Sequence, residues 1–580
     1  MRQVARVART SWPAALALAL AIVLLGPALG PGLVLAYDLG WSPDPRFTPF
    51  VTGVGMVAPR AVPSDAVGVS LGLLLGAGLA QKVTLVVVLA LCAAGPMYLL
   101  RALAPGASAV AVATAGVCGV WNPYVVERLA IGQWTILLGY GLVGFALRAL
   151  VRWHEDNRRW PTVLTWVGVA SLGGANTVII VLAALVPALL WTLMRTRTAA
   201  ALLAGVVFVG AAASAVWALP ALRAARDVAV AATVFAPRSD TPFGVLLSLV
   251  SGGGMWNSAS HPAARDLVIP ALGATLLAVL GAASAIGAAR SRPAARPLAA
   301  AAVVGLLVAG ASVVPGVADR WSGLLSTLPG GGLLRDSHKF VASWQVLLAL
   351  GLGFLVDRLG RLRVDGAWHP VAPVAQGGLL LLPAMLLPSA VWGLSARVQA
   401  VPVPVDYRAT AAALSSAEPG LVGVLPWNQY RRYPWNGART ALSIAPRAVD
   451  QQVLQNDALP TRTGWVPGED PVAARVSAAI AAGARPVAAL RAVGVRYVLV
   501  EADATPGSTT LDADPDLAGT RVLAAGPSAT AYDLGPTARA ASGPSPGVIR
   551  TGWAITVATW LTVVVFDVTH RRARRVARGS

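Results

Sequence analysis

Long apolar segments separated by short polar ones dominate the first 394 residues of the chain. Runs of about 18 or more hydrophobic residues recur there, and this length crosses the hydrocarbon core of a bilayer as a helix. The pattern predicts a polytopic α-helical membrane protein with about twelve spans. We expect a first span near the N-terminus, a second at 82–103, a third that ends at Trp121 and a fourth that ends at Arg152. Two more lie within 161–194, separated by GGAN (173–176). The remaining six are expected at 199–218, 267–289, 297–316, 340–360, 371–393 and 549–569.

The basic segments predict the orientation of the spans. Arginine-rich stretches such as RWHEDNRRW (152–160), ARSRPAARP (289–297) and HRRARRVARGS (570–580) all fall on one side of the membrane in this count. Because positively charged loops stay in the cytoplasm, we expect a multi-pass plasma-membrane protein with both termini cytoplasmic. The net charge of +20 therefore indicates topology rather than nucleic-acid binding.

A segment of different composition follows the spans that end near residue 394. Residues 395–547 contain strand-like runs such as GLVGVLPW and VRYVLVEA, with helix-like stretches such as PVAARVSAAIAAGA between them. They predict a C-terminal extracytoplasmic α/β domain. The expected organisation is a multi-span membrane domain (1–394), this α/β domain (395–547), and a final transmembrane helix with a basic cytoplasmic tail (548–580).

An acidic residue stands at the outer end of the first expected span, in YDLGWSPDP (37–45). Acids at the membrane surface are candidates for function, and Asp38 is placed to act as a general base toward an acceptor hydroxyl. The alternative is an interfacial aspartate that ends the helix. Asp44, between two prolines, is interpreted as a turn residue or as support for a metal or for the acceptor.

Charged residues also gather in two further outer segments. WNPYVVERLAIGQWTILLGY (121–140) contains Glu127 and Arg128, on a short helix that projects toward a cavity or forms an exposed salt bridge. GGGLLRDSHKF (330–340) contains three basic residues that are suited to bind the phosphate of a lipid carrier. The alternative is that the segment is a solvated helix start, capped by the neighbouring Asp or Ser. The three basic residues are Arg335, His338 and Lys339.

The first strand of the α/β domain is followed by LPWNQYRRYPWNGARTAL (425–442), which is rich in aromatic residues and arginines. Aromatic faces stack on sugar rings, and Arg bonds hydroxyls and phosphates. The segment predicts an acceptor-binding surface; a structural turn packed on the membrane domain is the alternative. The candidate acceptor-binding residues are Trp427, Tyr430, Arg431, Arg432 and Trp435.

With these motifs, the chain resembles the C superfamily (GT-C) of membrane glycosyltransferases. It is similar to the large YfhO-like bacterial membrane proteins and to the membrane part of actinobacterial arabinofuranosyltransferases. The resemblance is based on YDLGWSPDP, NPYVVERLAIGQWTILLGY, LLRDSHKF and the trailing outer α/β domain. The Ala-, Arg- and Gly-rich composition is also similar to that of a high-GC actinobacterium.

The resemblance implies transfer of a sugar from a polyprenyl-phosphate donor to a glycan or glycoconjugate of the cell envelope. Asp38 takes the place of the essential acid in the first outer loop, and Arg335, His338 and Lys339 would then face the carrier phosphate. Relatives often pair two acids in that loop, whereas Asp38 and Asp44 stand apart, so a divalent cation is an open expectation. A lipid-linked glycan transporter or flippase, or a non-catalytic envelope-assembly scaffold, are the alternative functions.

Overall fold

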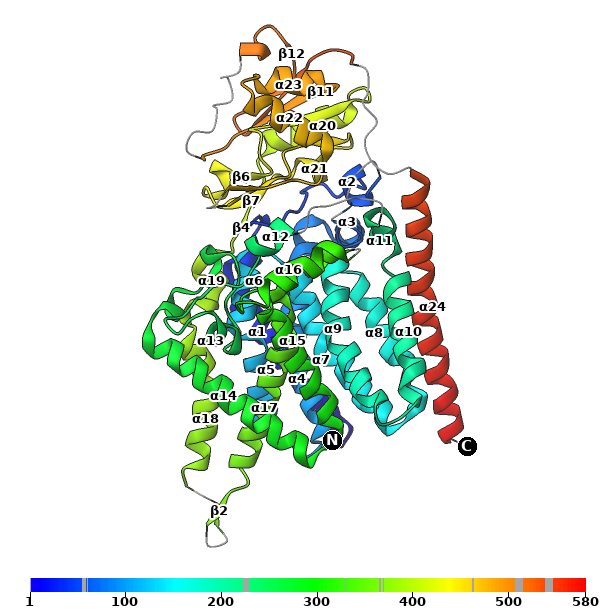
Figure 1. Ribbon diagram of the computed structural model, residues 1–580, viewed down its shortest axis with the longest axis vertical. Helices are drawn as coiled ribbons and strands as arrows, with labels where there is room; N and C mark the ends of the chain where they lie inside the picture. The colour runs from blue at the N-terminus through cyan, green and yellow to red at the C-terminus, as the bar shows by residue number, and fades with distance from the viewer. Residues whose placement is uncertain are drawn as a thin grey trace.

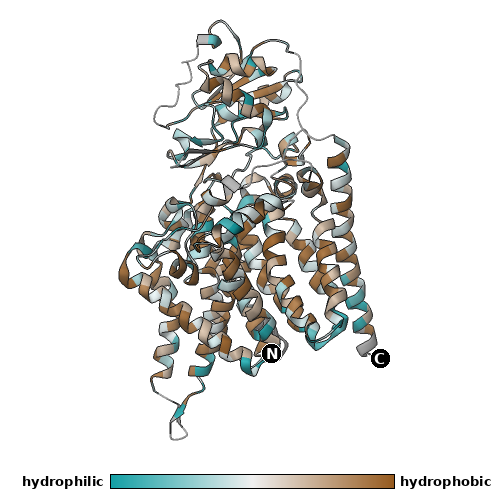
Figure 2. Cartoon of the chain, viewed as in Figure 1, coloured by the Kyte–Doolittle hydropathy of each residue, from teal (hydrophilic) through white to brown (hydrophobic). Residues whose placement is uncertain are grey.

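The structure is a computed structural model that describes residues 2–54, 59, 61–222, 229–328, 330–364, 367–368, 370–461, 464–505, 515–537 and 546–579. Its larger part is a bundle of long helices, and a region rich in strands sits at one end of that bundle (Figure 1). Hydrophobic residues follow the length of the bundle helices, whereas hydrophilic residues gather in loops and in the strand-rich region (Figure 2).

Nine helices of the described residues are long and apolar enough to cross a membrane, or eleven when each of two bent pairs counts as one span. The predicted multi-pass membrane fold is therefore confirmed. The nine helices are α1 (Arg2–Leu25), α4 (Ala77–Leu103), α5 (Ala109–Val120) continued by α6 (Pro123–Ala130), α7 (Trp134–Glu155), α9 (Ala175–Leu193), α14 (Val268–Ser291), α15 (Arg296–Gly310), α17 (Val341–Leu359) and α24 (Pro546–Gly579). The bent pairs are α10 (Thr198–Ala212) with α11 (Ala215–Ala221), and α18 (Ala372–Leu386) with η8 (Pro388–Ala390) and α19 (Val391–Ala396).

The difference from the expected count of twelve lies in α8 (Trp160–Ser171). The chain breaks at the GGAN stretch as predicted, with Gly174 at φ 78° before α9. However, the 12 residues of α8 rise only about 18 Å, which is less than the ~30 Å of a hydrocarbon core. The shorter helices of the described residues also include α2 (Pro49–Thr52), α3 (Ser64–Leu75), α12 (Ala229–Val234), α13 (Val245–Val250) and α16 (Ala318–Thr327).

Two glycine contacts bring bundle helices close together. A Cβ on Gly144 of α7 would lie 2.6 Å from the carbonyl carbon of Gly95 in α4, and a Cβ on Gly351 of α17 would overlap the carbonyl oxygen of Gly281 in α14. Small residues allow helix backbones to approach in this way inside membranes. The contacts fix α7 and α17, and both helices begin next to the charged segments predicted from the sequence.

The strand-rich region, called here the sheet domain (residues 400–533), is built on one five-stranded sheet of order β12-β13-β11-β5-β8. β11 runs parallel to β5 and antiparallel to β13. The strand-like runs GLVGVLPW and VRYVLVEA both form strands in it, so the predicted α/β fold is confirmed. The sheet strands are β5 (Leu421–Leu425), β8 (Val453–Leu454), β11 (Val495–Glu501), β12 (Arg521–Ala525) and β13 (Ala529–Asp533).

Smaller elements complete the sheet domain and its junction with the bundle. Two of its helices, α22 (Pro471–Ala481) and α23 (Pro486–Ala492), contribute to a core cluster with β5 and β11. The remaining elements there are α20 (Val405–Ser416), α21 (Ala445–Ala448), β1 (Leu33–Val34), β4 (Ala400–Val401), β6 (Tyr430–Arg432), β7 (Thr440–Leu442), β9 (Leu459–Thr461) and β10 (Gly464–Val466). β2 (Arg363–Val364) and β3 (Ala367–Trp368) instead form a hairpin between α17 and α18, at the opposite end of the bundle (Figure 1).

Candidate functional site

The loop that follows the first span is held by the sheet domain. β1 pairs antiparallel with β4. Further along, the Tyr37 N–H donates to the Thr440 carbonyl at 2.7 Å, and the Leu442 N–H donates to the Tyr37 carbonyl at 2.9 Å. The loop also lies against Gly132, where a Cβ would overlap the Ala36 carbonyl oxygen. These contacts fix the backbone on both sides of Asp38.

The carboxylate of Asp38 receives one hydrogen bond from the bundle and one from the sheet domain. Gln133 Nε2 donates to Oδ2 at 2.9 Å, and the Tyr430 hydroxyl donates to Oδ1 at 2.9 Å. Burial raises the pKa of Asp38 above its usual range, whereas the two hydrogen bonds and the positive charges of Arg128 and Arg447 act in the opposite direction. A carboxylate whose pKa is raised is a better proton acceptor, which suits a general base.

Gln133 connects Asp38 to a buried ion pair. Arg128 NH1 donates to Gln133 Oε1 at 2.6 Å, and the two terminal nitrogens of Arg128 form a bidentate pair with Asp336 at 2.6 and 3.0 Å. Arginine can only donate hydrogen bonds, so the Gln133 oxygen must face Arg128 and its amino group must face Asp38. The ion pair therefore fixes the orientation of the amide that holds the carboxylate of Asp38.

His338 lies directly behind this ion pair and is completely buried. Its Nδ1 is 2.9 Å from Arg128 NH2, and its Nε2 is 3.1 Å from the Gly253 carbonyl oxygen. Since Arg128 donates, Nδ1 accepts and Nε2 carries the hydrogen, which defines a neutral ring. The sequence predicted that His338 contacts a lipid phosphate. In the structure, both of its ring nitrogens contact groups of the protein instead.

The other two predicted cations differ in exposure. Lys339 is buried, and its ammonium group donates to Asn176 Oδ1 at 2.9 Å and to the Leu333 carbonyl. Arg335 has a side chain that is 35% exposed and lies over the Phe235 ring at 4.8 Å. Of the three predicted phosphate ligands, Arg335 is thus the one with an accessible side chain.

Glu127 and Arg128 are both completely buried, so they do not form an exposed salt bridge, and their hydrogen bonds go to different groups. The Glu127 carboxylate accepts hydrogen bonds from the backbone N–H groups of Gly254 and Met255 at 3.4 and 3.2 Å. α6 is therefore packed between the segment around residue 254 on one side and the Gln133 contact on the other.

The segment around residue 254 contains an ion pair that the sequence analysis did not identify. Arg265 donates to both oxygens of Asp240, at 2.5 and 3.0 Å, and both side chains are buried. Burial alone would raise the pKa of Asp240, but the charge and hydrogen bonds of Arg265 hold it well below the usual range. The pair rigidifies the backbone that binds Glu127.

Tyr430 is the predicted acceptor-binding residue that contacts Asp38. Its neighbour Arg431 points the other way, is completely buried, and donates from Nε to Glu501 Oε2 at 2.8 Å. The Tyr407 and Tyr433 hydroxyls donate to the other oxygen of Glu501 at 2.7 and 2.9 Å. Arg431 is therefore part of the interior of the sheet domain.

The other three predicted acceptor-binding residues have different surroundings. Trp427 packs against the core cluster of the sheet domain and donates from Nε1 to Ser477 Oγ at 2.9 Å. Trp435 stacks on Tyr433 with ring centroids 4.6 Å apart. Arg432 is exposed. The structure brings only Tyr430 of this group to the Asp38 carboxylate, and the two tryptophans pack against protein.

Asp44 is not placed as a second carboxylate beside Asp38, because it forms a bidentate pair with Arg408 at 3.0 and 2.6 Å. Among the described residues, no group of three or more His, Cys, Asp or Glu side chains is arranged to hold a metal ion. Hydrogen-bond donors, rather than further carboxylates, surround Asp38. This donor set does not fit a divalent cation.

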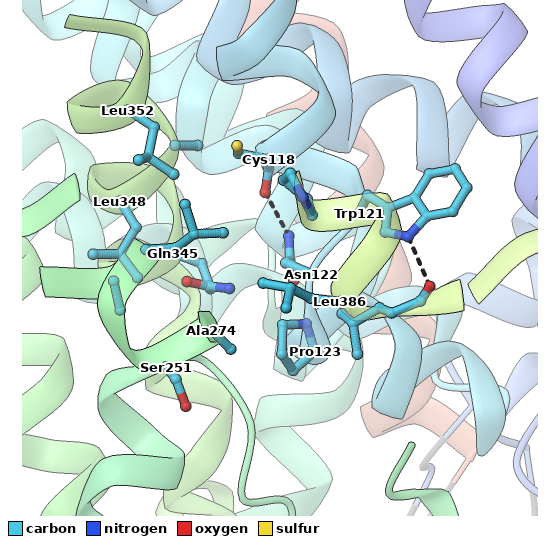
Figure 3. A pocket seen from close by; sticks show the side chains of 15 residues that line it. Cys118, Trp121, Asn122, Pro123, Ser251, Ala274, Gln345, Leu348, Leu352 and Leu386 are labelled. Carbon is cyan, nitrogen blue, oxygen red and sulfur yellow. Dashed lines mark hydrogen bonds between the residues drawn. The ribbon is translucent and has the colours of Figure 1, made fainter. Parts of the chain in front are cut away.

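An apolar cavity lies beside the junction of α5 and α6, between α14, α17 and α18 (Figure 3). Its wall is mainly apolar, and Asn122, Ser251 and Gln345 are among the polar residues that line it. Trp121 Nε1 donates to the Leu387 carbonyl at the bend after α18. The N-terminal end of α6 thus borders this cavity, and its C-terminal end carries Arg128.

The arrangement of spans, short outer helices and trailing sheet domain is shared with two solved structures, so the likeness expected from the sequence motifs holds at the level of the fold. The structure is similar to that of the arabinofuranosyltransferase AftD from Mycobacteria, solved as a mutant in two classes. The TM-scores are 0.58 and 0.53, the identities 19% and 17%, and each alignment covers 91% of this chain and 41% of the AftD chain. The protein therefore spans about two fifths of the length of AftD.

A further solved structure, that of ArnT from Cupriavidus metallidurans in the apo state, aligns with a TM-score of 0.44 and 15% identity. That alignment covers 93% of this chain and 100% of the ArnT chain. No protein-family model matches the sequence, and no curated protein matches it either.

Proposed function

We propose that this protein is a membrane glycosyltransferase that moves a sugar from a polyprenyl-phosphate donor to a glycan or glycoconjugate of the cell envelope on the outer side of the membrane. The observation that carries the proposal is the Asp38 carboxylate, which follows the first span of a GT-C fold and has a raised pKa and hydrogen bonds on both oxygens. Because AftD is named an arabinofuranosyltransferase, arabinofuranose is the first sugar to test.

In the proposed reaction, Asp38 accepts the proton of an acceptor hydroxyl while that oxygen bonds to the anomeric carbon. The bond from the anomeric carbon to the phosphate oxygen breaks, and polyprenyl phosphate leaves with the electron pair. The carrier phosphate is itself the leaving group, so no nucleotide is needed. Gln133 and Tyr430 hold the carboxylate in position, and Arg335 remains the accessible cation among the predicted phosphate ligands.

The experiment that tests this function uses the purified chain in nanodiscs with polyprenyl-phosphate-linked arabinofuranose and a synthetic oligosaccharide acceptor. We expect a longer oligosaccharide whose formation requires both substrates. The yield should be the same in EDTA, because the groups that contact the Asp38 carboxylate are hydrogen-bond donors and not metal ligands. Donor that stays intact on the wild-type protein under all conditions would contradict the enzyme hypothesis. Movement of intact donor between leaflets would instead favour a flippase.

Tyr430→Phe is expected to move the acid limb of the pH profile of kcat/KM to higher pH. Transfer rises with pH as Asp38 ionises, and the Tyr430 hydroxyl favours the ionised form. Its loss raises the pKa of Asp38 further, so the ionised fraction at a given acidic pH falls. The missing hydrogen bond should also lower the plateau rate by about 2- to 10-fold. Tyr497→Phe, which removes a hydroxyl bonded to the Glu418 carbonyl at 2.9 Å, should leave the profile unchanged. An unshifted limb in Tyr430→Phe would refute this role.

Cysteine labelling tests the proposed orientation, in which the sheet domain is outside and both termini are cytoplasmic. Cys92 and Cys118 are buried, so new cysteines can be read against a low background. Ser416→Cys in the sheet domain and Arg571→Cys at the end of α24 both replace exposed residues. On intact cells, a membrane-impermeant maleimide should label only the former. Labelling of the latter without permeabilisation would reverse the topology.

A further inference from the structure

Arg447, a cation of the sheet domain, reaches the loop that contains Asp38. Arg447, in α21, packs so closely on the backbone two residues after Asp38 that a Cβ on Gly40 would lie 2.7 Å from Arg447 NH1. The guanidinium also lies 4.7 Å above the Phe50 ring. Only glycine at position 40 allows this approach without a shift of the arginine.

The hydrogen bonding of Arg447 leaves its outer nitrogens available. Nε donates to Asp65 Oδ2 at 2.7 Å, which anchors the side chain. Among the described residues, none accepts a hydrogen bond from NH1 or NH2, and the side chain is 10% exposed. By contrast, the terminal nitrogens of Arg128 are fully engaged with Gln133, Asp336 and His338.

Arg447 and Asp65 border a cavity next to the Asp38 loop. Apart from these two charged side chains, the wall of the cavity is mainly apolar. A cation held by one carboxylate, with two donors still open beside an apolar recess, is suited to an amphipathic anion, because arginine binds phosphate oxygens through two parallel N–H groups. The lining residues are Gly40, Trp41, Ser42, Pro45, Val51, Asp65, Gly68, Val69 and Arg447.

We propose that Arg447 binds the phosphate of the lipid-linked donor through NH1 and NH2, next to Asp38. This inference rests on the proposed function and adds a residue that no motif of the sequence indicated. When the bond from the anomeric carbon breaks, its electron pair stays on the phosphate oxygen, and Arg447 stabilises that added negative charge. The proton of the acceptor hydroxyl passes to Asp38 in the same step. Acid and cation thus come from different parts of the chain, and the sheet domain completes the site.

The test measures binding of farnesyl phosphate, a short prenyl phosphate, to the full chain in nanodiscs, with farnesol and inorganic phosphate as separate probes. Arg447→Gln should weaken farnesyl phosphate binding by about 10- to 100-fold, the loss expected for a charge-assisted contact. Binding of farnesol should not change. Arg447→Lys should fall between wild type and Arg447→Gln, because lysine offers a point charge without the planar fork.

Matched variants separate binding from structure. Arg408→Gln breaks another ion pair at the same junction, with Asp44, and should bind farnesyl phosphate as wild type does. Asp65→Asn removes the anchor of Arg447 but keeps its charge, so binding should stay within about threefold, less than the loss of one such contact. An equal loss in Asp65→Asn and Arg447→Gln would overturn the inference, because the ion pair alone would then matter.

The two proposals fail in different ways. If the wild-type protein binds farnesyl phosphate no better than farnesol, the polyprenyl-phosphate donor itself is refuted. If wild type prefers the phosphate and Arg447→Gln binds it equally well, the proposed function stands and the role of Arg447 is refuted. Should Arg447→Gln fail to fold, Arg447→Lys decides: wild-type binding in that folded variant would exclude a bidentate contact.

Discussion

Asp38→Asn is expected to lower the rate of sugar transfer by about 10²- to 10⁴-fold, the range that a general base contributes. An amide has nearly the shape of a carboxylate but does not accept a proton. The measurement is the single-turnover rate with saturating donor and acceptor. Binding of farnesyl phosphate should remain, since Asp38 contacts the acceptor rather than the carrier in the proposed reaction.

The hydrogen bonds of Asp38 allow Asp38→Asn to remove the proton acceptor without disturbing the structure around it. Gln133 donates to one oxygen, and its amide cannot rotate because Arg128 requires its acceptor side. In Asp38→Asn, the oxygen of the new amide would therefore face Gln133, and its amino group would face Tyr430, whose hydroxyl can turn and accept. We expect an unchanged melting temperature. Asp44→Asn, which alters an exposed pair with Arg408, is the matched control. Transfer by Asp38→Asn within about threefold of wild type, far less than a general base contributes, would exclude Asp38 as the base.

The sequence predicted the spans and strands well because both have simple periodic signals. A helix that spans a bilayer needs a long run of apolar residues, and a buried strand needs a short apolar run or an alternation of apolar and polar residues. α8 shows where the signal fails: its apolar composition is that of a span, but the glycines at 173 and 174 end the helix after 12 residues. Hydropathy alone does not measure helix length across such a break.

The site was predictable only in part, because its contacts join distant segments. Asp38 could be identified as an acid at a helix end, yet Tyr430, its hydrogen-bond partner, is 392 residues away in the sequence. Gln133 lies within the segment 121–140 but carries no charge, so nothing in the sequence distinguished it from a surface amide. Arg447 lies in an ordinary APRA sequence. Its importance comes from the close approach to Gly40, which no local pattern encodes.

Strand geometry also separated neighbours that the sequence analysis grouped together. Tyr430, Arg431 and Arg432 form β6, and successive side chains of a strand point to opposite faces. Arg431 therefore enters the interior of the sheet domain, while Tyr430 meets Asp38 on the other face. The grouping assumed that a cluster of recognition residues shares one surface, and the period of two makes that impossible within a strand.

Arg431→Ala is expected to destabilise the sheet domain by about 3–5 kcal/mol, the effect of removing one partner of a buried ion pair. The Arg431 and Glu501 side chains are both 0% exposed, so the substitution would leave Glu501 buried without a cationic partner. Arg432→Ala is the adjacent control. Its side chain is exposed, and substitutions of that kind stay within about 0.5 kcal/mol.

Pulse proteolysis of the full chain in increasing urea measures both effects, since cleavage within residues 400–533 reports unfolding of the sheet domain. Transfer and donor hydrolysis should decline together in Arg431→Ala, in proportion to the folded fraction, because the residue does not reach the site. Arg432→Ala should keep wild-type stability, and any change it causes should appear in the KM for the acceptor. The opposite result for Arg431→Ala, wild-type stability with a raised acceptor KM, would mean that its side chain leaves Glu501 to bind the acceptor, as the sequence alone suggested.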